Sequence, residues 1–178
     1  MDDDNDLIRG TLAGRQQDFE ILVERYQKML YAFVFRSLRD SNAAEEVVQA
    51  TFVRAYSELA RFRGEATFKT WLHQIALNQC RALYRSRRVR QAVSLDDVPE
   101  GALPHGEDDL ERRATHAALE RLIDRLPPRQ RSVLSLRIFS DLPFKDIARI
   151  EGITENSAKV NYHHAVTRLK QWLAHETS

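Results

Sequence analysis

The chain has 178 residues, of which 43% are hydrophobic, and its formal net charge is only +1 at pH 7. Such an apolar fraction excludes a wholly disordered chain, and the length allows one domain of ordinary size or two small ones. The chain opens without a basic-then-apolar leader, and no apolar run approaches the ~18 residues that span a bilayer. We therefore expect a cytoplasmic protein.

A single cysteine, Cys80, excludes an internal disulfide and fits a reducing compartment. Because Cys80 lies in an apolar helical pattern, we expect a buried thiol rather than a redox sensor. The six histidines show no metal-ligand spacing with Cys80, and His163 and His164 are adjacent, so they face different sides of a helix. The sequence predicts neither a metal site nor a cofactor.

Three amphipathic helices are predicted in the first half of the chain, because apolar residues recur there at helical spacing. The second begins at a capping-box-like Asn42, with Glu45 three residues later, and a loop over 62–67 separates it from the third. The residues expected to face inward are Phe19, Leu22, Val23, Tyr26, Leu30 and Phe33 in the first helix, Val47, Val48, Thr51, Ala55, Tyr56 and Leu59 in the second, and Phe68, Trp71, Leu72, Ile75, Ala76 and Leu83 in the third. These stripes can bury one another in an all-helical domain over residues 1–92.

The third helix also carries an ordered polar face, with no acidic residue between Ala66 and Leu95. Its members are three or four residues apart and therefore stack along one side; they are Gln74, Asn78, Arg81, Arg85 and Arg88. A basic edge beside aromatic Phe68, Trp71 and Tyr84 suits a nucleic-acid backbone and an unstacked base. A solvated basic face next to ordinary core aromatics is the alternative.

The second helix is expected to present Glu45, Glu46 and Gln49 outward, with Phe52 accessible beside them. An acidic and aromatic surface suits a protein partner with a basic helix. The alternative is a solvated acidic helix start, which the helix macrodipole also favours.

A change of composition divides the chain. The segment 93–109 contains SLDDVPEGALPHGEDD, with prolines, glycines and many acids but no helical period, so it predicts a flexible linker. A second helical domain is expected over 110–178, beginning with a stripe at Leu119, Leu122, Ile123 and Leu126. The fold class predicted is all-α, with two small helical domains on an acidic tether.

The stretch 142–172 has the pattern of a helix-turn-helix. Pro143 suits the first helical turn, Gly152 a left-handed turn and Thr154 the cap of the next helix. The inward residues expected are Phe144, Ile147, Ala148 and Ile150, then Ala158, Tyr162, Ala165 and Leu169; Asn156, Lys159, His163 and His164 remain outward. A helix of this kind can lie in the major groove of DNA.

These segments, in this order, resemble the extracytoplasmic-function (ECF) class of bacterial sigma factors in the sigma-70 family. In the first domain the resemblance rests on AEEVVQ from Ala44, FRG from Phe62, FKTWL from Phe68 and IALN from Ile75. In the second it rests on LPPRQRSVLSLR from Leu126 and on the helix-turn-helix. Members of this family bind the β′ and β subunits of core RNA polymerase, recognise promoter DNA and are usually held inactive by an anti-sigma factor, often bound to the membrane.

The resemblance implies roles for particular residues. Those expected to dock on the β′ clamp helices are Glu45, Glu46, Gln49 and Phe52. The −10 element would be held by the loop residues Phe62, Arg63, Ala66, Thr67 and Lys69, and by Asn78, Arg81, Arg85 and Arg88. The −35 element would meet Asn156, Lys159, Val160, His163 and His164, with Arg137 and Lys145 on phosphates.

The chain departs from the family pattern at several of these positions. Leu77 and Ala82 stand where arginine and aspartate are frequent. In the recognition helix the residues that replace a glycine and three arginines are, in order, Asn156, Asn161, His164 and Val166. We therefore expect a distinct and weaker −35 preference, in which Val160 meets a thymine methyl and Asn156 an adenine edge.

Two other classes of function are alternatives to a sigma factor. A LuxR-like regulator would bind an operator unaided, but the first half shows no strand alternation, acidic receiver pocket or dimerisation helix. An all-helical adaptor would tolerate reversal of the Arg81 and Arg85 charges. An enzyme is not expected, because the sequence shows no nucleophile–base pattern, phosphate loop or metal spacing.

Overall fold

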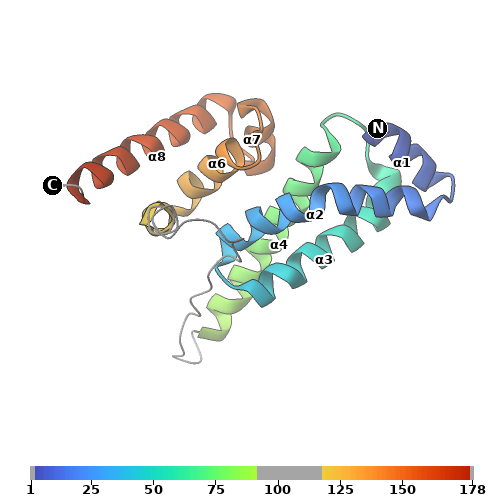
Figure 1. Ribbon diagram of the computed structural model, residues 1–178, viewed down its shortest axis with the longest axis horizontal. Helices are drawn as coiled ribbons and strands as arrows, with labels where there is room; N and C mark the ends of the chain where they lie inside the picture. The colour runs from blue at the N-terminus through green and yellow to red at the C-terminus, as the bar shows by residue number, and fades with distance from the viewer. Residues whose placement is uncertain (1–2, 92–117, 177–178) are drawn as a thin grey trace, which may run out of the picture. The chain divides into compact units, whose positions relative to one another are not determined.

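The computed structural model describes residues 3–91 and 118–176, and every regular element in these two ranges is helical (Figure 1). The elements are α1 (Asp4–Leu12), α2 (Gln16–Leu38), α3 (Ser41–Glu58), the short 3₁₀ helix η1 (Leu59–Arg61), α4 (Phe68–Gln91), α6 (Pro128–Ile138), α7 (Phe144–Glu151) and α8 (Glu155–Glu176), with a further helical stretch over 118–124. The described residues form two compact units, the first over 3–91 and the second over 118–176. The all-α fold is confirmed, and the predicted linker 93–109 lies outside the described residues.

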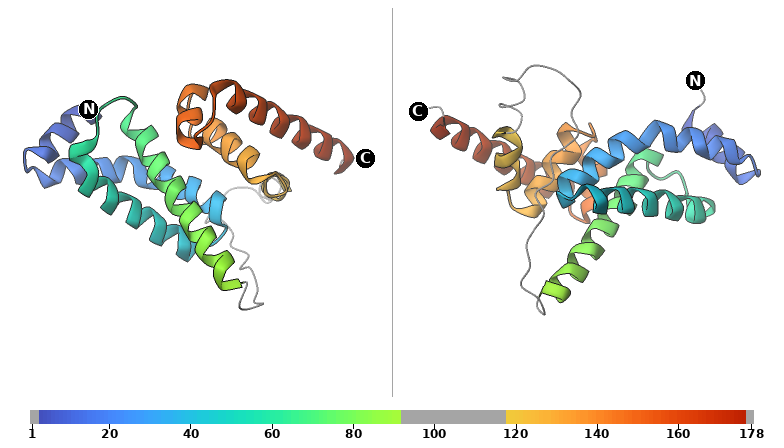
Figure 2. Two further views of the ribbon diagram at one scale, coloured as in Figure 1. Left: turned by 180° about the vertical axis from the view of Figure 1, so that it is seen from behind. Right: turned by 60° about the horizontal axis from the view of Figure 1, so that its bottom comes forward.

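The first unit is built on α2, α3 and α4, which all pack on one another (Figure 2). Their apolar stripes meet in a core whose fully buried side chains include Leu22, Phe33, Leu59, Phe68 and Leu72. None of the helices in the ranges 3–91 and 118–176 is long and apolar enough to cross a membrane.

Helix α1 was not predicted, because the stretch at its start is acidic and has few apolar residues. It packs on α2 through buried Leu7 and Ile8. Asp4 accepts hydrogen bonds from Arg25 Nη1 at 2.5 Å and from the Tyr26 hydroxyl. Burial, followed by the bond to Asp4, raises the pKa of Tyr26, so the phenol stays protonated as a donor.

The start of α3 differs from the prediction. Its N-cap is Asp40, not Asn42: the Asp40 carboxylate accepts from the backbone N–H of Ala43 at 3.0 Å. Asp40 also pairs with Arg87 of α4 at 2.7 Å. The bond from Ala43, followed by the arginine, lowers the pKa of Asp40. Asp40 therefore fixes the start of α3 against α4, a long-range contact that a local capping pattern does not contain.

The buried face of α3 also differs from its predicted stripe. Phe52 is only 7% exposed, whereas Tyr56 is 49% exposed. The expectation of an accessible Phe52 and a buried Tyr56 is therefore wrong. Because α3 packs on both α2 and α4, its buried face is wider than one stripe and is rotated toward Phe52.

The buried thiol predicted at Cys80 is confirmed, since only 1% of the residue is exposed. Burial raises the pKa of this thiol to about 12, so thiolate chemistry is suppressed at neutral pH.

The second unit buries Leu122, Ile123, Leu126 and Leu134 against Ala165 and Leu169 of α8. Pro127 is the N-cap of α6 and Pro128 its first residue, positions at which a missing N–H costs nothing. The guanidinium of Arg125 lies 4.6 Å from the centre of the Trp172 ring. The long helix α8 thus covers the core of the second unit with one side, and its other side faces solvent.

The predicted helix-turn-helix is present, except that Pro143 is the N-cap of α7 and not part of its first turn. Gly152 ends α7 in the left-handed region, with φ of +68°. The Thr154 hydroxyl accepts from the N–H of Ser157 at 3.1 Å, which caps the start of α8. Buried Glu151 accepts a hydrogen bond from the Ser132 hydroxyl, which ties the turn to α6.

Replacing Gly152 by alanine is expected to destabilise the second unit by about 1–2 kcal/mol, because an L-residue is strained in this backbone conformation. A Cβ here would have no neighbour within 4 Å, so the cost lies in the backbone and not in a clash. Urea unfolding monitored by Trp172 fluorescence in a Trp71→Phe background measures it. Gly152→Asn is the matched control and should retain most of the stability, since asparagine tolerates this region. Equal stability of the alanine variant and the parent would contradict the strain argument.

Candidate interaction surfaces

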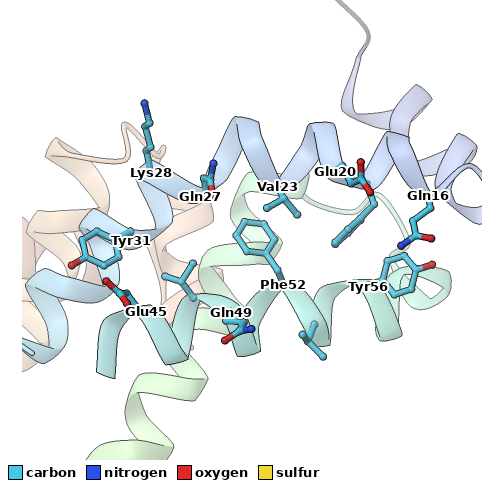
Figure 3. Close-up of a pocket in the computed structure, with 13 residues that line it drawn as sticks. Gln16, Glu20, Val23, Gln27, Lys28, Tyr31, Glu45, Gln49, Phe52 and Tyr56 are labelled. Atoms are coloured by element: carbon cyan, nitrogen blue, oxygen red, sulfur yellow. The ribbon is translucent and has the colours of Figure 1, made fainter. Parts of the chain in front are cut away.

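A groove of about 860 Å³ lies between α2 and α3 in the first unit (Figure 3). Val23 of α2 and Phe52 of α3 lie near each other in its middle, with Tyr31 and Glu45 toward one end and Tyr56 at the other. Its lining residues are Gln16, Phe19, Glu20, Val23, Gln27, Lys28, Tyr31, Glu45, Val48, Gln49, Phe52, Val53 and Tyr56. The surface is thus apolar and aromatic, with a polar rim of three glutamines, two glutamates and one lysine.

Three of the four residues predicted to bind polymerase lie at this groove, namely Glu45, Gln49 and Phe52. Glu45 and Gln49 are exposed, whereas Phe52 contributes to the wall as a buried side chain. Glu46 is exposed but does not line the groove.

The groove also contains residues that sequence reasoning missed. Val53 is 66% exposed and Tyr56 49% exposed, both on α3. On the α2 side, Val23 and Tyr31 complete the surface. No signal in the sequence marked Val53, because single apolar side chains are common on protein surfaces.

The loop before α4 is held by aromatic contacts and by a cap. The Phe62 ring lies 5.1 Å from Trp71 and 6.0 Å from Phe68, so Phe62 is half-buried. The Thr67 hydroxyl accepts from the N–H of Thr70 at 3.1 Å. These contacts order the loop from both ends.

The other predicted loop residues lie around this aromatic cluster. Arg63 and Thr67 are exposed, while Ala66 and Lys69 are partly buried. The carbonyl of Lys69 lies 2.8 Å from Nδ1 of His73, which is buried. Burial lowers the pKa of His73 to about 4, so His73 is neutral at pH 7 and its Nδ1–H donates to the carbonyl.

The basic face of α4 is confirmed in part. Asn78 and Arg85 are exposed and Arg81 is partly buried, while the side chain of Arg88 lies outside the described residues. We refer to these four residues as the α4 basic stripe. Arg87, next to the stripe, is engaged by Asp40, so it braces the fold. Arg85 is exposed and therefore accessible to a ligand.

The outward face of α8 is as predicted: Asn156, Lys159, Val160, His163 and His164 are all exposed, and we refer to these five residues as the reading face. Lys159 Nζ lies 2.7 Å from a Glu155 carboxylate oxygen. Asn161 is turned away, because its amide donates to the carbonyl of Ser157 at 2.8 Å.

The two residues predicted to contact phosphates differ in how far their side chains are already engaged by the protein. Lys145 is exposed. Arg137 already pairs with Asp141 at 3.2 Å, donates to the carbonyl of Leu142 at 3.2 Å and lies 5.5 Å from the centre of the Phe144 ring. A phosphate would have to compete with these contacts for Arg137. Within residues 3–91 and 118–176 no cluster of histidine, cysteine or acidic residues could hold a metal ion.

Comparison with known proteins connects both units to one family. Residues 22–90 match Sigma-70 region 2, and residues 116–169 match Sigma-70 region 4. The RNA polymerase sigma-H factor of Pseudomonas aeruginosa is 31% identical over 160 residues, which are 84% of this chain and 83% of that protein. The ECF RNA polymerase sigma-E factor of Haemophilus influenzae is 30% identical over 158 residues, 83% of this chain and 82% of that protein.

Solved structures have the same fold. CnrH, in complex with the cytosolic domain of CnrY, has a TM-score of 0.74 at 24% identity, covering 97% of this chain and 98% of that chain. The sigma factor RpoE of Bartonella quintana, in complex with the anti-sigma factor NepR, has a TM-score of 0.75 at 23% identity, covering 89% and 98%. The two matched regions and the relatives of similar length agree with the residues from which the resemblance was drawn. The chain therefore belongs to the ECF class of sigma-70 family RNA polymerase sigma factors, which direct promoter-specific initiation of transcription.

Proposed function

We propose that this sigma factor docks on core RNA polymerase through the groove between α2 and α3, with Glu45, Gln49 and exposed Val53 in contact with the β′ subunit. The observation that carries the proposal is an accessible apolar groove on a folded unit, with a polar rim that includes Glu20 and Glu45. Burial of that surface provides affinity, and Glu20 and Glu45 favour a basic partner helix. Glu46 would contribute at the edge.

The −10 element is assigned to the α4 basic stripe and to the loop residues Phe62, Arg63, Ala66, Thr67 and Lys69. Unstacking a base costs a few kcal/mol. An ordered loop can offset this by holding the extruded base, while arginines neutralise the separated strand. The loop is held in place by Phe62 and by the Thr67 cap before any ligand arrives.

The −35 element is assigned to the reading face of α8, with Lys145 and Arg137 on the flanking phosphates. Each unit buries little DNA surface and binds weakly alone. When both are held on one polymerase, the second contact becomes intramolecular and the two reinforce each other through effective concentration. The protein supplies recognition and strand separation, while bond chemistry belongs to the polymerase.

Lys159→Ala is expected to reduce −35-dependent transcription by about tenfold or more, because it removes an exposed cation from the reading face. Asn161→Ala is the matched control on the same helix and should change transcription less than about twofold, since its amide is bonded to the helix backbone. Transcription from promoters with and without the −35 element measures both effects. Equal losses in the two variants would contradict the assigned orientation of α8.

Control by an anti-sigma factor is also proposed, and it would keep the protein in the cytoplasm or at the inner membrane. One structural neighbour, the sigma factor RpoE of Bartonella quintana, was solved in complex with the anti-sigma factor NepR. The groove is a surface that such a partner could block. This part of the proposal would be contradicted if no protein recovered with the chain from its native host inhibited transcription, and if the products of neighbouring genes had no effect either.

In vitro transcription with bacterial core polymerase on a library of promoter-like DNA tests the whole assignment. Initiation that depends on this protein and selects shared −35 and −10 motifs is the expected result. High-affinity duplex binding without polymerase and without initiation would instead indicate an operator-binding regulator.

A further inference from the structure

The reading face of α8 has little fixed charge. Its one lysine, Lys159, lies 2.7 Å from Glu155, and both side chains are about half exposed. Glu155 offsets part of the charge of Lys159, which is the one fixed cation of the reading face. Asn156 and Val160 are neutral. Duplex DNA carries one negative charge per ~1.7 Å. The reading face therefore attracts it only weakly while its histidines are uncharged.

The remaining polar residues of this face are two exposed imidazoles, those of His163 and His164. Neighbouring residues on a helix are separated by ~100° around its axis. The two imidazoles can therefore point to opposite walls of a major groove, where the phosphates run. Histidine is the side chain whose charge changes between about pH 5 and pH 8.

The surroundings of the imidazoles contain more cations than carboxylates. On α8 itself, Lys159 lies one turn before His163 and Arg168 one turn after His164. The helices α6 and α7 and the helical stretch 118–124 pack on α8, and the charged residues of these elements are Glu120, Arg121, Asp124, Arg129, Arg131, Arg137, Lys145, Asp146, Arg149 and Glu151.

Several of these charged side chains are paired with groups other than the imidazoles. Arg131 pairs with Asp124, Arg137 pairs with Asp141, and Glu151 is buried against Ser132. Within residues 118–175 no carboxylate forms an ion pair with either imidazole. The protein alone thus gives the charged imidazoles little support, whereas DNA phosphates would give a great deal.

We propose that His163 and His164 supply the positive charge of the reading face by taking up protons as α8 meets the phosphates of the −35 element. Recognition of the −35 element then strengthens as the pH falls. This inference rests on the proposed −35 role of the second unit. The sign follows from linkage, because the DNA-bound state binds more protons than the free state and its population therefore rises at lower pH.

The size of the effect has a simple upper limit. An imidazole with the ordinary histidine pKa of about 6.5 that stays charged on DNA gains up to about 25-fold in affinity between about pH 8 and pH 6. Two such groups gain up to about 600-fold. Each charged imidazole on a phosphate also adds ~0.9 to the slope of log affinity against log salt concentration.

Another histidine limits the pH range of the test. His73 is buried in the first unit, and burial lowers its pKa to about 4. The unfolded chain would bind this proton from about pH 6.5 downward, so the first unit loses stability as the pH falls below that value. Measurements at about pH 6 and above keep this loss small.

The experiment uses holoenzyme, reconstituted from core polymerase and the full chain, and a promoter selected by that holoenzyme. Fluorescence anisotropy measures its affinity for the intact promoter and for one with a scrambled −35 element, at about pH 6 and about pH 8. The ratio of the two affinities isolates the −35 contact. We expect this ratio to rise at the lower pH, with an upper limit of about 600-fold.

The double variant His163→Gln/His164→Gln should abolish the rise and lower the salt slope at about pH 6 by up to about 2. His175→Gln, near the exposed end of the same helix, should retain both. As a second readout, the imidazole NMR signals of the full chain should titrate at higher pH once −35 duplex is added.

A −35 ratio that is the same at both pH values, or a pH effect that persists in the double variant, would overturn the inference while leaving the −35 assignment intact. If scrambling the −35 element has no effect at any pH, the −35 assignment itself fails, and the inference fails with it.

Discussion

Replacing Val53 by glutamate is expected to weaken the binding of this sigma factor to core RNA polymerase by at least about tenfold. Val53 lines the groove and is 66% exposed, so the change leaves the core of the first unit intact. If a partner helix covers the groove, the new carboxylate is buried without a partner, which is costly. A titration of fluorescently labelled protein with core polymerase measures the affinity directly.

The neighbouring Phe52 would be a poor choice for this experiment. It is only 7% exposed, so its truncation leaves a cavity of the kind that costs several kcal/mol of stability. Loss of binding could then reflect loss of folding.

Ile21→Glu is the matched control. Ile21 lies on α2, is 40% exposed and does not line the groove, so the same chemical change falls outside the proposed contact. Its effect on core binding should stay below about twofold. Unchanged binding of the Val53 variant, or equal losses in both, would show that the groove is not the docking surface.

Replacing Arg85 by glutamate is expected to reduce promoter opening by more than about tenfold, because it removes one phosphate contact and adds a repulsive charge. Arg85 is exposed on the α4 basic stripe, so the fold should tolerate the change. Permanganate reactivity of unpaired thymines in the −10 region measures opening. Binding to core polymerase should not change, since Arg85 does not line the groove.

Arg9→Glu on α1 provides the control of equal charge. Arg9 is exposed and pairs only at the surface with Asp6, so its reversal should leave promoter opening nearly unchanged. Normal opening by the Arg85 variant, and by a variant that also reverses Arg81, would favour a protein-interaction adaptor with incidental basic residues.

The helices predicted with success are those whose burial is decided by periodicity. The stripes of α2 and α4 and the turn at Gly152 follow from local spacing and from the conformational freedom of glycine, so they could be identified without coordinates. The outward position of Lys159 and the two neighbouring histidines follows from the same spacing. The linker and the domain boundaries at 92 and 110 remain predictions.

The errors occurred where residues distant in sequence set the outcome. Helix α1 is held by Asp4 against Arg25 and Tyr26, and a local pattern contains no sign of such a contact. The cap of α3 was assigned to Asn42, although Asp40 takes that place because it also meets Arg87. The burial of Phe52 depends on how α3 rotates between two neighbouring helices.

For this protein, the amino-acid pattern established the all-helical class, the helix-turn-helix and the sigma-factor family, because helical period, turn residues and motifs are properties of short stretches. The groove was decided by packing. It combines Val23 of α2 with Phe52 and Val53 of α3, and its existence depends on the distance and rotation between two helices. The same packing engaged Arg87 with Asp40 and left Arg85 exposed. Such distinctions arise from side-chain burial and long-range pairing, which no spacing within one helix specifies.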